Sequence, residues 1–307
     1  MKAIQMTGYG DSFVLKIANI DKPVPASGQV LIKIAATTIN PFDIKIRSGA
    51  MKQFIPVPMP YVPGSDLSGT VEEVGENVTR LKKGDQVFTT TFGGTYAEYI
   101  ALDEKNISLI PENVTLNEAA ALAVPLNTAY SVLVEAANLQ AGQKLLVHGA
   151  SGAVGAVIVQ MAKALGAYII GTASGQGKDL IKSLGADEVI DYKSEDFTKL
   201  VRGVDVVVDL VGGETLQKSY ALVKKGGKLF SMVMPTSNDE AEKYGITAAF
   251  INSVPTLEKL TFGKKLVEEN KVVPQIAKVM NLETAAAAQD IVTAGGLNGK
   301  VVLQVTQ

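Results

Sequence analysis

Two kinds of hydrophobic pattern divide the chain, and the first occupies residues 1 to about 118. Short apolar runs there are separated by turns: FVLKIANI, QVLIKIAATTI, SGTVEEVG, DQVFTT and AEYIAL. Short strands at close spacing, with Gly and Pro between them, are typical of a partly open barrel. A proline-rich stretch, FIPVPMPYVPG (54–64), predicts an extended loop that crosses this region.

The second pattern alternates strands with helices. A buried strand, a glycine turn and an alanine-rich helix make up LLVHGASGAVGAVIVQMAKALGA (145–167). Further along come the expected strands YIIGTAS (168–174), DEVIDY (187–192), VDVVVDLVGG (204–213) and GGKLFSMVMP (226–235), with helical GKDLIKSLGA (177–186) after the first of them. This rhythm predicts βαβ units in a doubly wound parallel sheet.

The C-terminal tail is too short to form a domain of its own. It holds a helical LETAAAAQDIVTAGG and a strand, GKVVLQV (299–305), which we expect to return to the barrel. Because 307 residues exceed a typical single core, two domains are expected. We place the first at residues 1–118, completed by 272–307, and the second at 119–271.

Glycines at positions 149, 152 and 155 follow the first strand of the second pattern. Small residues there let the backbone turn sharply and let a pyrophosphate approach the N–H groups of a helix N-terminus. Ala150 stands where the common G-x-G-x-x-G form has its first glycine, so a simple tight turn is the alternative. With the βαβ context, the pattern favours a dinucleotide site.

Composition excludes several classes of protein. The formal net charge of −2 shows no excess of basic residues of the kind that binds nucleic acid or an anionic membrane surface. The start, MKAIQMTGYG, has no apolar core segment, and the apolar stretch 118–139 is interrupted by Asn127 and Thr128, so we expect a cytoplasmic protein.

The chain has no cysteine and one histidine, His148, so it lacks an ordinary set of zinc ligands. We expect His148 to lie partly buried beside the glycine turn rather than to act as a general acid.

Motifs along the whole chain resemble one enzyme superfamily. They are INPFDIKIRSG (39–49), VPGSDLSGTVEEVG (62–75), LKKGDQVF (81–88), YAEYIAL, AALAVPLNTAY, VHGASGAVG, LGADEVIDY and NGKVVLQV. In this order they look like the medium-chain dehydrogenase/reductase superfamily, most of all its zinc-free quinone oxidoreductase and enone reductase branch. The resemblance implies an α/β protein: a GroES-like, partly open β-barrel domain plus a Rossmann doubly wound parallel-sheet domain, with the active site in the cleft between them. Zinc alcohol dehydrogenases have Gly-His-Glu where this chain has Gly64-Ser65-Asp66, so no metal site is expected.

The expected cofactor is NADPH. An NAD site usually has an acidic residue at the end of its second strand, whereas residues 172–176 read TASGQ. Ser174 and Lys178 supply a hydroxyl and a cation for a 2′-phosphate, although an N-cap and a solvated lysine would explain them separately. The resemblance adds Tyr192 to this set. The expected cofactor-binding residues are Thr128, Gly149, Ser151, Gly152, Ala153, Val154, Ser174, Lys178, Tyr192, Val211 and Met232.

Two of the candidate site residues also have plain structural explanations. Asn40, before Pro41 and with Asp43 three residues on, suits a helix start. The resemblance implies that Asn40 also lines the cleft near the nicotinamide and the substrate carbonyl. In the resembled family, a threonine that matches Thr128 contacts the nicotinamide amide. The alternative explanation for Thr128 is structural: its hydroxyl would bond back to the backbone of its own helix. Met51, Lys52 and Gln53 stand where some relatives have an active-site tyrosine, so no general acid is identified.

The resulting expectation is a zinc-independent, NADPH-dependent oxidoreductase that transfers hydride to a quinone or an α,β-unsaturated carbonyl. Its partner is a small-molecule electron acceptor, with no membrane and no expected nucleic acid. A homodimer is expected through the apolar strand KLFSMVMP (228–235), if that strand lies at a sheet edge. The alternative is a non-catalytic NADPH-binding protein, a sensor or an RNA-binding protein, derived from such an enzyme. Tyr220 and Lys224 have the spacing of a short-chain dehydrogenase pair, but they follow the glycine turn of a mid-chain domain, which argues against that family.

Overall fold

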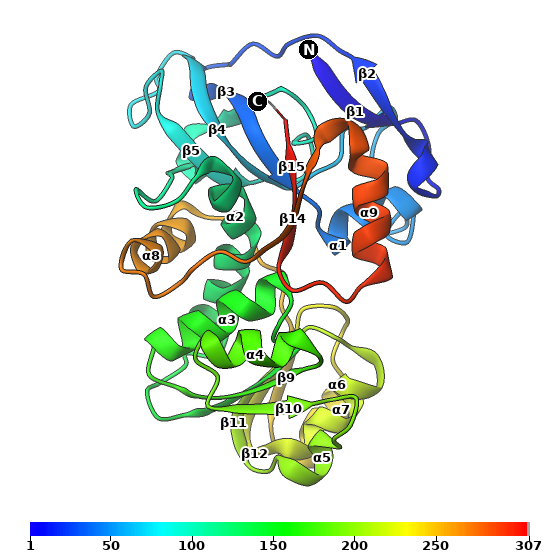
Figure 1. Ribbon diagram of the computed structural model, residues 1–307, viewed down its shortest axis with the longest axis vertical. Coiled ribbons are helices and arrows are strands. Elements are labelled where there is room, and N and C mark those ends of the chain that lie inside the picture. The colour runs from blue at the N-terminus through cyan, green and yellow to red at the C-terminus, as the bar shows by residue number, and fades with distance from the viewer. Residues whose placement is uncertain (306–307) are drawn as a thin grey trace. The chain divides into compact units, whose positions relative to one another are not determined.

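The computed structural model describes residues 1–305, which divide into two compact units (Figure 1). The first unit comprises Met1–Val124, Pro255–Lys264 and the described chain from Pro274 onward. The second comprises Pro125–Val254 and Lys265–Val273. Each unit has its own sheet and its own core, as expected from the two hydrophobic patterns.

The first unit is built on a mainly antiparallel sheet of seven strands, in the order β14-β15-β3-β4-β5-β7, with β6 also paired to β3. A separate two-stranded sheet joins β1 and β2. The strands are β1 (Lys2–Met6), β2 (Leu15–Asn19), β3 (Gln29–Thr38), β4 (Asp66–Val74), β5 (Gln86–Thr90), β6 (Tyr99–Asp103), β7 (Ser108–Leu109), β14 (Ile276–Asn281) and β15 (Lys300–Gln304). This is the expected GroES-like, partly open barrel.

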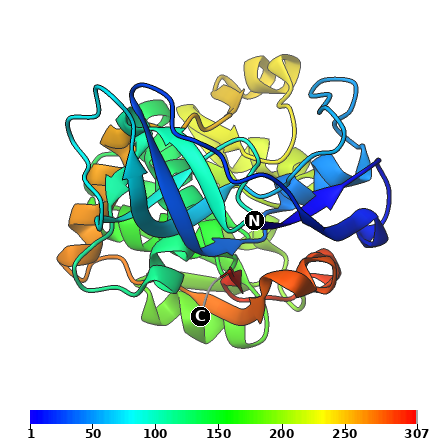
Figure 2. The same cartoon turned by 90° about the horizontal axis from the view of Figure 1, so that it is seen from above.

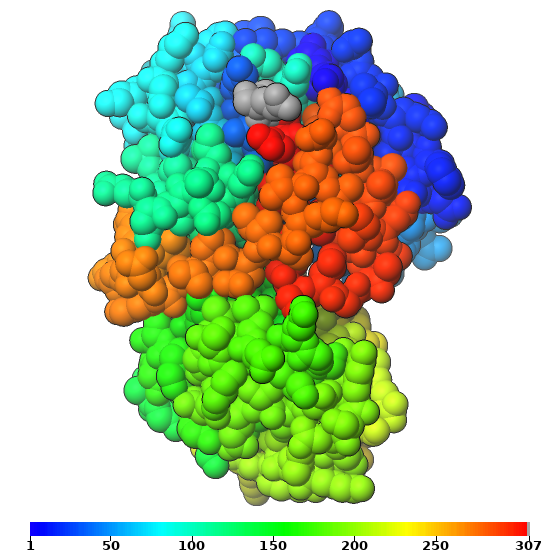
Figure 3. Space-filling model, viewed as in Figure 1, coloured from blue at the N-terminus to red at the C-terminus, as the bar shows by residue number. Residues whose placement is uncertain are grey.

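The C-terminal segment completes the first unit. Strand β15 pairs antiparallel with β3, with Val302 opposite Thr38, and parallel with β14. Strands β1 and β15 therefore belong to one unit although they lie at opposite ends of the sequence (Figure 2). In Figure 3 the orange and red residues of this segment form surface next to blue N-terminal residues. The tail thus returns to the barrel, as its length suggested.

Helices α1 (Pro41–Ser48) and α9 (Ala285–Ala294) contact each other in the first unit. Helix α2 (Leu116–Tyr130) is followed directly by the π-helix η3 (Ser131–Ala136), and α8 (Leu257–Glu268) comes later in the chain. The short 3-10 helices are η1 (Ser12–Val14), η2 (Glu104–Asn106) and η5 (Leu282–Thr284) in the first unit and η4 (Tyr220–Leu222) in the second. By length and composition the helical stretch Leu116–Ala136 resembles a membrane span, but 78% of its apolar window is buried inside the protein, as in a core helix.

The second unit contains an all-parallel sheet of six strands in the order β10-β9-β8-β11-β12-β13. Its strands are β8 (Lys144–His148), β9 (Tyr168–Ala173), β10 (Glu188–Asp191), β11 (Val204–Asp209), β12 (Val223–Ser231) and β13 (Thr247–Phe250). The connecting helices are α3 (Ala153–Ala164), α4 (Gln176–Ser183), α5 (Phe197–Leu200), α6 (Gly213–Ser219) and α7 (Asn238–Tyr244). Numbered from β8, the order is 3-2-1-4-5-6, the doubly wound Rossmann arrangement.

The dimer prediction had one condition, an edge position for KLFSMVMP, and this condition is not met. Strand β12 contains the first four residues of KLFSMVMP, Lys228–Ser231, and lies between β11 and β13 rather than at an edge. The edges are formed by β10 and β13, and the sequence of β13, TAAF, is too short and too weakly apolar to stand out as a strand. Any pairing of sheet edges between two copies would therefore involve β10 or β13.

Candidate functional site

The expected cofactor residues of the second unit follow the carboxyl ends of its strands. The order of the sheet reverses between β8 and β11, and ligands of open α/β sheets bind at such a switch point. Gly149 follows β8, and a Cβ built on it would lie 3.3 Å from Leu210 Cβ and 3.4 Å from Val211 Cγ2. The glycine turn and the loop after β11 are thus neighbours, which brings Val211 to the turn.

The three glycines of the turn have different structural roles. Gly149 has φ 72°, a left-handed conformation that L side chains rarely adopt. Gly155 has no room for a side chain, because its Cβ would lie 2.2 Å from the Gly149 carbonyl oxygen. Gly152 has φ −69°, and its Cβ would make only an ordinary contact of 3.4 Å with the same oxygen. The fold itself therefore requires glycine at 149 and 155 but not at 152.

Gly152 is the N-cap of α3, and no side chain caps this helix. Ser151, Gly152, Ala153 and Val154 are each partly exposed, whereas α3 is buried from Gly155 to Ala162. The first N–H groups of a helix have no partner within it, and with the helix dipole they favour an anion. This uncapped, accessible start fits the pyrophosphate of a dinucleotide.

A second polar group gathers where β9 and β10 end. The Ser174 hydroxyl donates to the Tyr192 hydroxyl at 2.9 Å, so the two expected hydroxyls are in contact. Lys178, on α4, lies 2.7 Å from the carboxylate of Asp191. These four residues, Ser174, Lys178, Asp191 and Tyr192, form what we call the ribose corner.

Asp191 is the member of the ribose corner that sequence reasoning missed. That reasoning considered carboxylates after the second strand of the sheet, whereas Asp191 ends the third strand, β10. Its position directly before Tyr192 was visible in the sequence. Its contact with Lys178 depends on how α4 lies across β9 and β10, which only the fold provides.

The remaining expected cofactor residues lie near strand ends or in α2. The Val211 N–H donates to Asp209 Oδ1 at 3.0 Å, and the Met232 N–H donates to the Asp209 carbonyl at 3.0 Å. Asp209, fully buried at the end of β11, thus holds both loops. Thr128 is 8% exposed near the end of α2.

His148 is buried, with 1% exposure, rather than partly buried as expected. Its Nδ1 lies 3.2 Å from Thr172 Oγ1, and its Nε2 lies 3.0 Å from Ser219 Oγ. Ser219 donates its proton to the Thr215 carbonyl at 2.6 Å, so His148 Nε2 acts as the donor to Ser219 Oγ. Burial lowers the pKa of His148 to about 4. This histidine links β8, β9 and α6.

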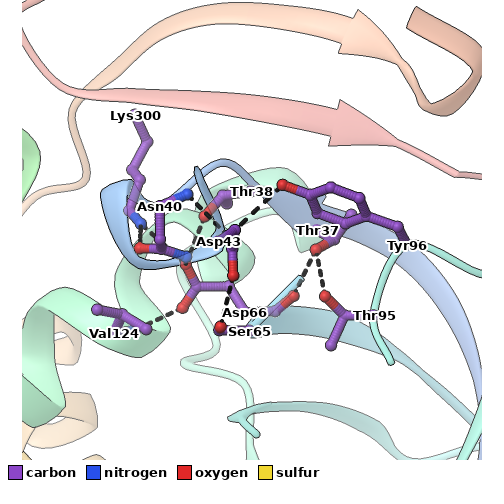
Figure 4. Close-up of polar contacts among 10 residues, drawn as sticks. All are labelled: Thr37, Thr38, Asn40, Asp43, Ser65, Asp66, Thr95, Tyr96, Val124 and Lys300. Atoms are coloured by element: carbon purple, nitrogen blue, oxygen red, sulfur yellow. Dashed lines mark hydrogen bonds and ion pairs between the residues drawn. The ribbon is translucent and has the colours of Figure 1, made fainter. Parts of the chain in front are cut away.

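In the first unit, Asn40 lies in a buried polar network (Figure 4). Its Nδ2 donates to Asp66 Oδ2 at 2.9 Å, and its Oδ1 accepts from the Lys300 ammonium. Lys300 also pairs with Asp66 at 2.9 Å; the exposed fractions of the two side chains are 4% and 0%. Asp66 further accepts from the Thr38 hydroxyl and, at 2.6 Å, from the Val124 N–H. The Asn40 amide is thus fixed in orientation by a buried ion pair.

Asn40 is also the N-cap of α1, with Pro41 at the first helical position, as its spacing predicted. Asp43 accepts the Asn40 N–H at 2.9 Å and the Ser65 hydroxyl at 2.7 Å. Burial raises the pKa of Asp43 to about 6, against the lowering effect of these hydrogen bonds. The first-turn carboxylate therefore faces the interior of the unit (Figure 4).

The buried cation next to Ser65 and Asp66 is an ammonium group. Sequence reasoning singled out these two residues but missed Lys300, which is 234 residues from Asp66. The one feature of the sequence that could have pointed to Lys300 is a lysine at the start of an otherwise mainly apolar strand. Within residues 1–305, no group of three or more His, Cys, Asp or Glu side chains is arranged to hold a metal ion.

Comparisons with known proteins agree with this geometry. Residues 26–112 match the alcohol dehydrogenase GroES-like domain, and residues 184–303 match the zinc-binding dehydrogenase family. The chain is 35% identical to the quinone oxidoreductase of Mus musculus, over 99% of this chain and 97% of that protein. It is 43% identical to the 2-methylene-furan-3-one reductase of Solanum lycopersicum, over 75% of this chain and 61% of that protein.

A solved structure has the same fold. The Escherichia coli quinone oxidoreductase, complexed with NADPH, superposes with a TM-score of 0.91 at 25% identity, covering 99% of this chain and 100% of that one. The chain belongs to the medium-chain dehydrogenase/reductase superfamily and is an oxidoreductase, related to its quinone oxidoreductases and enone reductases.

Proposed function

We propose that this protein is an NADPH-dependent oxidoreductase that reduces a quinone or an α,β-unsaturated carbonyl by hydride transfer. The observation that carries the proposal is the second unit's arrangement of an uncapped helix start beside the switch point and a lysine with two hydroxyls at the ends of β9 and β10. An NADPH-bound quinone oxidoreductase with the same fold supports the choice of cofactor. We assign this role to the domain at 119–271, and the acceptor side to the domain at 1–118 with 272–307.

Each part of the site has a distinct task in binding the dinucleotide. The N-terminus of α3, with Gly149, Ser151, Gly152, Ala153 and Val154, takes the pyrophosphate. Ser174, Lys178 and Tyr192 take the 2′-phosphate, and Thr128, Val211 and Met232 lie toward the nicotinamide. When bound, NADPH supplies the hydride, while the protein holds donor and acceptor in register and excludes water.

The proposed acceptors need little acid catalysis. A hydroquinone anion or an enolate is stable enough to take its proton from water, which agrees with the absence of an identified general acid. We propose that Asn40 orients the acceptor carbonyl. One of its two Nδ2 hydrogens bonds Asp66, and the ion pair of Asp66 with Lys300 keeps the amide from rotating.

We propose that the reaction needs no zinc. The position that supplies a catalytic ligand in zinc alcohol dehydrogenases is Ser65 here, and its hydroxyl is bonded to Asp43. The neighbouring carboxylate, Asp66, is already neutralised by Lys300. A divalent cation would have to displace the ammonium group or stand beside it, and like charges at that distance repel strongly in a buried site.

The test is NADPH oxidation followed against a panel of quinones and enones, with NADH alongside and with exhaustively chelated enzyme. We expect turnover with NADPH, lower efficiency with NADH, and full activity after chelation. NADPH binding without turnover of any acceptor would favour a sensor. Loss of activity on chelation with recovery on zinc addition would overturn zinc independence.

We also propose a cytoplasmic homodimer. The edge strand β13 offers unpaired backbone groups, and its Phe250 is 46% exposed. Light scattering that finds only monomer at micromolar concentration would contradict the dimer.

A further inference from the structure

The ribose corner contains an acid as well as a base. Asp191 uses one carboxylate oxygen for Lys178, at 2.7 Å, and the other for the Lys193 N–H, at 3.1 Å. The Lys178 side chain is 41% exposed and the Asp191 side chain 17%. The only cation expected to hold a 2′-phosphate is therefore already paired with a less accessible carboxylate.

More negative charge surrounds this pair. Glu195 accepts the Asp191 N–H at 2.8 Å, and Asp179 is next to Lys178 in sequence. The pKa of Lys178 is raised chiefly by its hydrogen bond to Asp191, and the charges of Asp179 and Glu195 raise it further. A phosphate monoester carries about −1.5 to −2 charges at neutral pH, so it enters a corner that already holds several carboxylates.

We propose that Asp191 sets the cofactor preference of this enzyme, by competing with the 2′-phosphate of NADPH for Lys178 and so keeping the selectivity over NADH low. This inference rests on the proposed NADPH-dependent function. With NADPH, Lys178 is shared between two anions. With NADH, the ion pair stays intact, and the Asp191 carboxylate is available to accept a ribose hydroxyl, as acidic residues do in NAD-specific sites.

The charge balance sets the expected size of the effect. Releasing an exposed lysine from a competing carboxylate restores one charge-assisted contact with the phosphate, which strengthens binding by roughly three- to tenfold. Asp191→Asn removes this charge, keeps the size of the side chain and leaves the lysine free. NADPH should then bind roughly three- to tenfold more tightly, and NADH no more tightly than to the unaltered protein.

The experiment is isothermal titration of the full chain with NADPH, NADH, adenosine 2′,5′-bisphosphate and 5′-AMP. Adenosine 2′,5′-bisphosphate should follow NADPH, and 5′-AMP should follow NADH, because only NADPH and adenosine 2′,5′-bisphosphate carry the 2′-phosphate that meets Lys178. Glu188→Gln is the matched control: it removes one carboxylate from the same strand, where Glu188 bonds Tyr168. Its affinity for every probe should stay within twofold of the unaltered protein.

A second substitution of Asp191 separates the loss of charge from a folding defect, and a substitution of Lys178 tests whether the gain depends on this lysine. Asp191→Ser removes the charge with a different side chain and should give the same gain, so a folding defect in one variant does not decide the test. In a Lys178→Met background the gain should shrink, since the lysine is gone. Unchanged or weaker NADPH binding in both Asp191 variants would overturn the inference while leaving NADPH binding itself established. Failure of the unaltered protein to bind NADPH would overturn the proposed function as well.

Discussion

The two units handle their polar side chains in opposite ways. In the first unit, Asn40, Asp66 and Lys300 are each at most 5% exposed and bond one another. In the second, the start of α3 has no side-chain cap, and Lys178 and Tyr192 are 41% and 54% exposed. Groups that satisfy each other maintain the fold, whereas groups left accessible remain free to bind a ligand. Substitutions in the first set should therefore lower stability, and those in the second should lower affinity.

The largest expected effect comes from breaking the buried ion pair. Asp66→Asn leaves the Lys300 ammonium buried without a counter-charge, which should lower the free energy of unfolding by about 3–5 kcal/mol. Urea unfolding followed by circular dichroism measures this loss, because the chain has no tryptophan.

The control is Asp103→Asn, which breaks the exposed pair between Asp103 and Lys105 in the same unit. Exposed pairs contribute about 0–1 kcal/mol, so its effect should be small. A loss below 1 kcal/mol for Asp66→Asn would show that the network does not depend on its central charge.

The next effect separates binding from folding within the glycine turn. Gly152→Val should abolish NADPH binding with only a modest loss in melting temperature, since the turn has room for a Cβ at 152. NADPH fluorescence titration and thermal unfolding of the same preparation test both halves. Gly155→Ala should instead lower the melting temperature strongly, because its Cβ would collide with the Gly149 carbonyl. Normal NADPH affinity in the valine variant would mean that this turn is not the phosphate site.

A smaller effect sharpens the assignment of the ribose corner. Lys178→Ala should weaken NADPH by about 1–3 kcal/mol and barely change NADH, because it removes one charge-assisted contact to the 2′-phosphate. Competition titrations with both cofactors measure the difference. Lys182→Ala, on the same helix, is the control, because Lys182 bonds the Asp187 carbonyl instead. Equal losses of NADPH and NADH would contradict the assignment of Lys178.

The smallest net effect is on the pH dependence of stability, where one group in each unit acts in opposite directions. The pKa of Asp43 is raised to about 6, so its contribution is fully present below 3.8 and is lost as pH rises through 6. The pKa of His148 is lowered to about 4, so its contribution is present above 6.5 and is lost as pH falls through 4. Between pH 4 and 6 the two nearly cancel when the whole chain unfolds in one transition.

Single substitutions should reveal each contribution. With Asp43→Asn the stability should rise from pH 4 to 6.5, and with His148→Gln it should fall from pH 4 to 6, as measured by denaturant unfolding at each pH. The same slope in both variants would contradict the opposite directions of the two shifts.

Local pattern predicted most of the fold. The alternation in QVLIKIAATTI predicted β3, and the apolar run before Gly149 predicted β8. Both predictions were possible because the burial of a strand shows in the pattern of consecutive residues. Strand β13 was not predicted because TAAF has no such pattern, and without it β12 remained a candidate for an edge strand.

The candidate site was predictable only in part. Sequence reasoning grouped Ser174 with Tyr192 through a resemblance, and the structure brings their hydroxyls into contact. It did not find the pair of Lys178 with Asp191, nor that of Lys300 with Asp66. Both contacts join residues from separate elements, so their partners depend on packing that no local window contains.

The return of β15 to the first unit has a consequence for how the protein is made. Asp66 leaves the ribosome 234 residues before its counter-charge, Lys300. At about 5–20 residues per second, the nascent chain waits roughly 10 to 50 seconds for this lysine. During that interval the whole second unit, which lies within residues 125–273, has already been synthesised and is able to fold. The first unit is therefore completed only after the second has been made, and its incomplete sheet exposes unpaired strand edges to aggregation until β15 is synthesised.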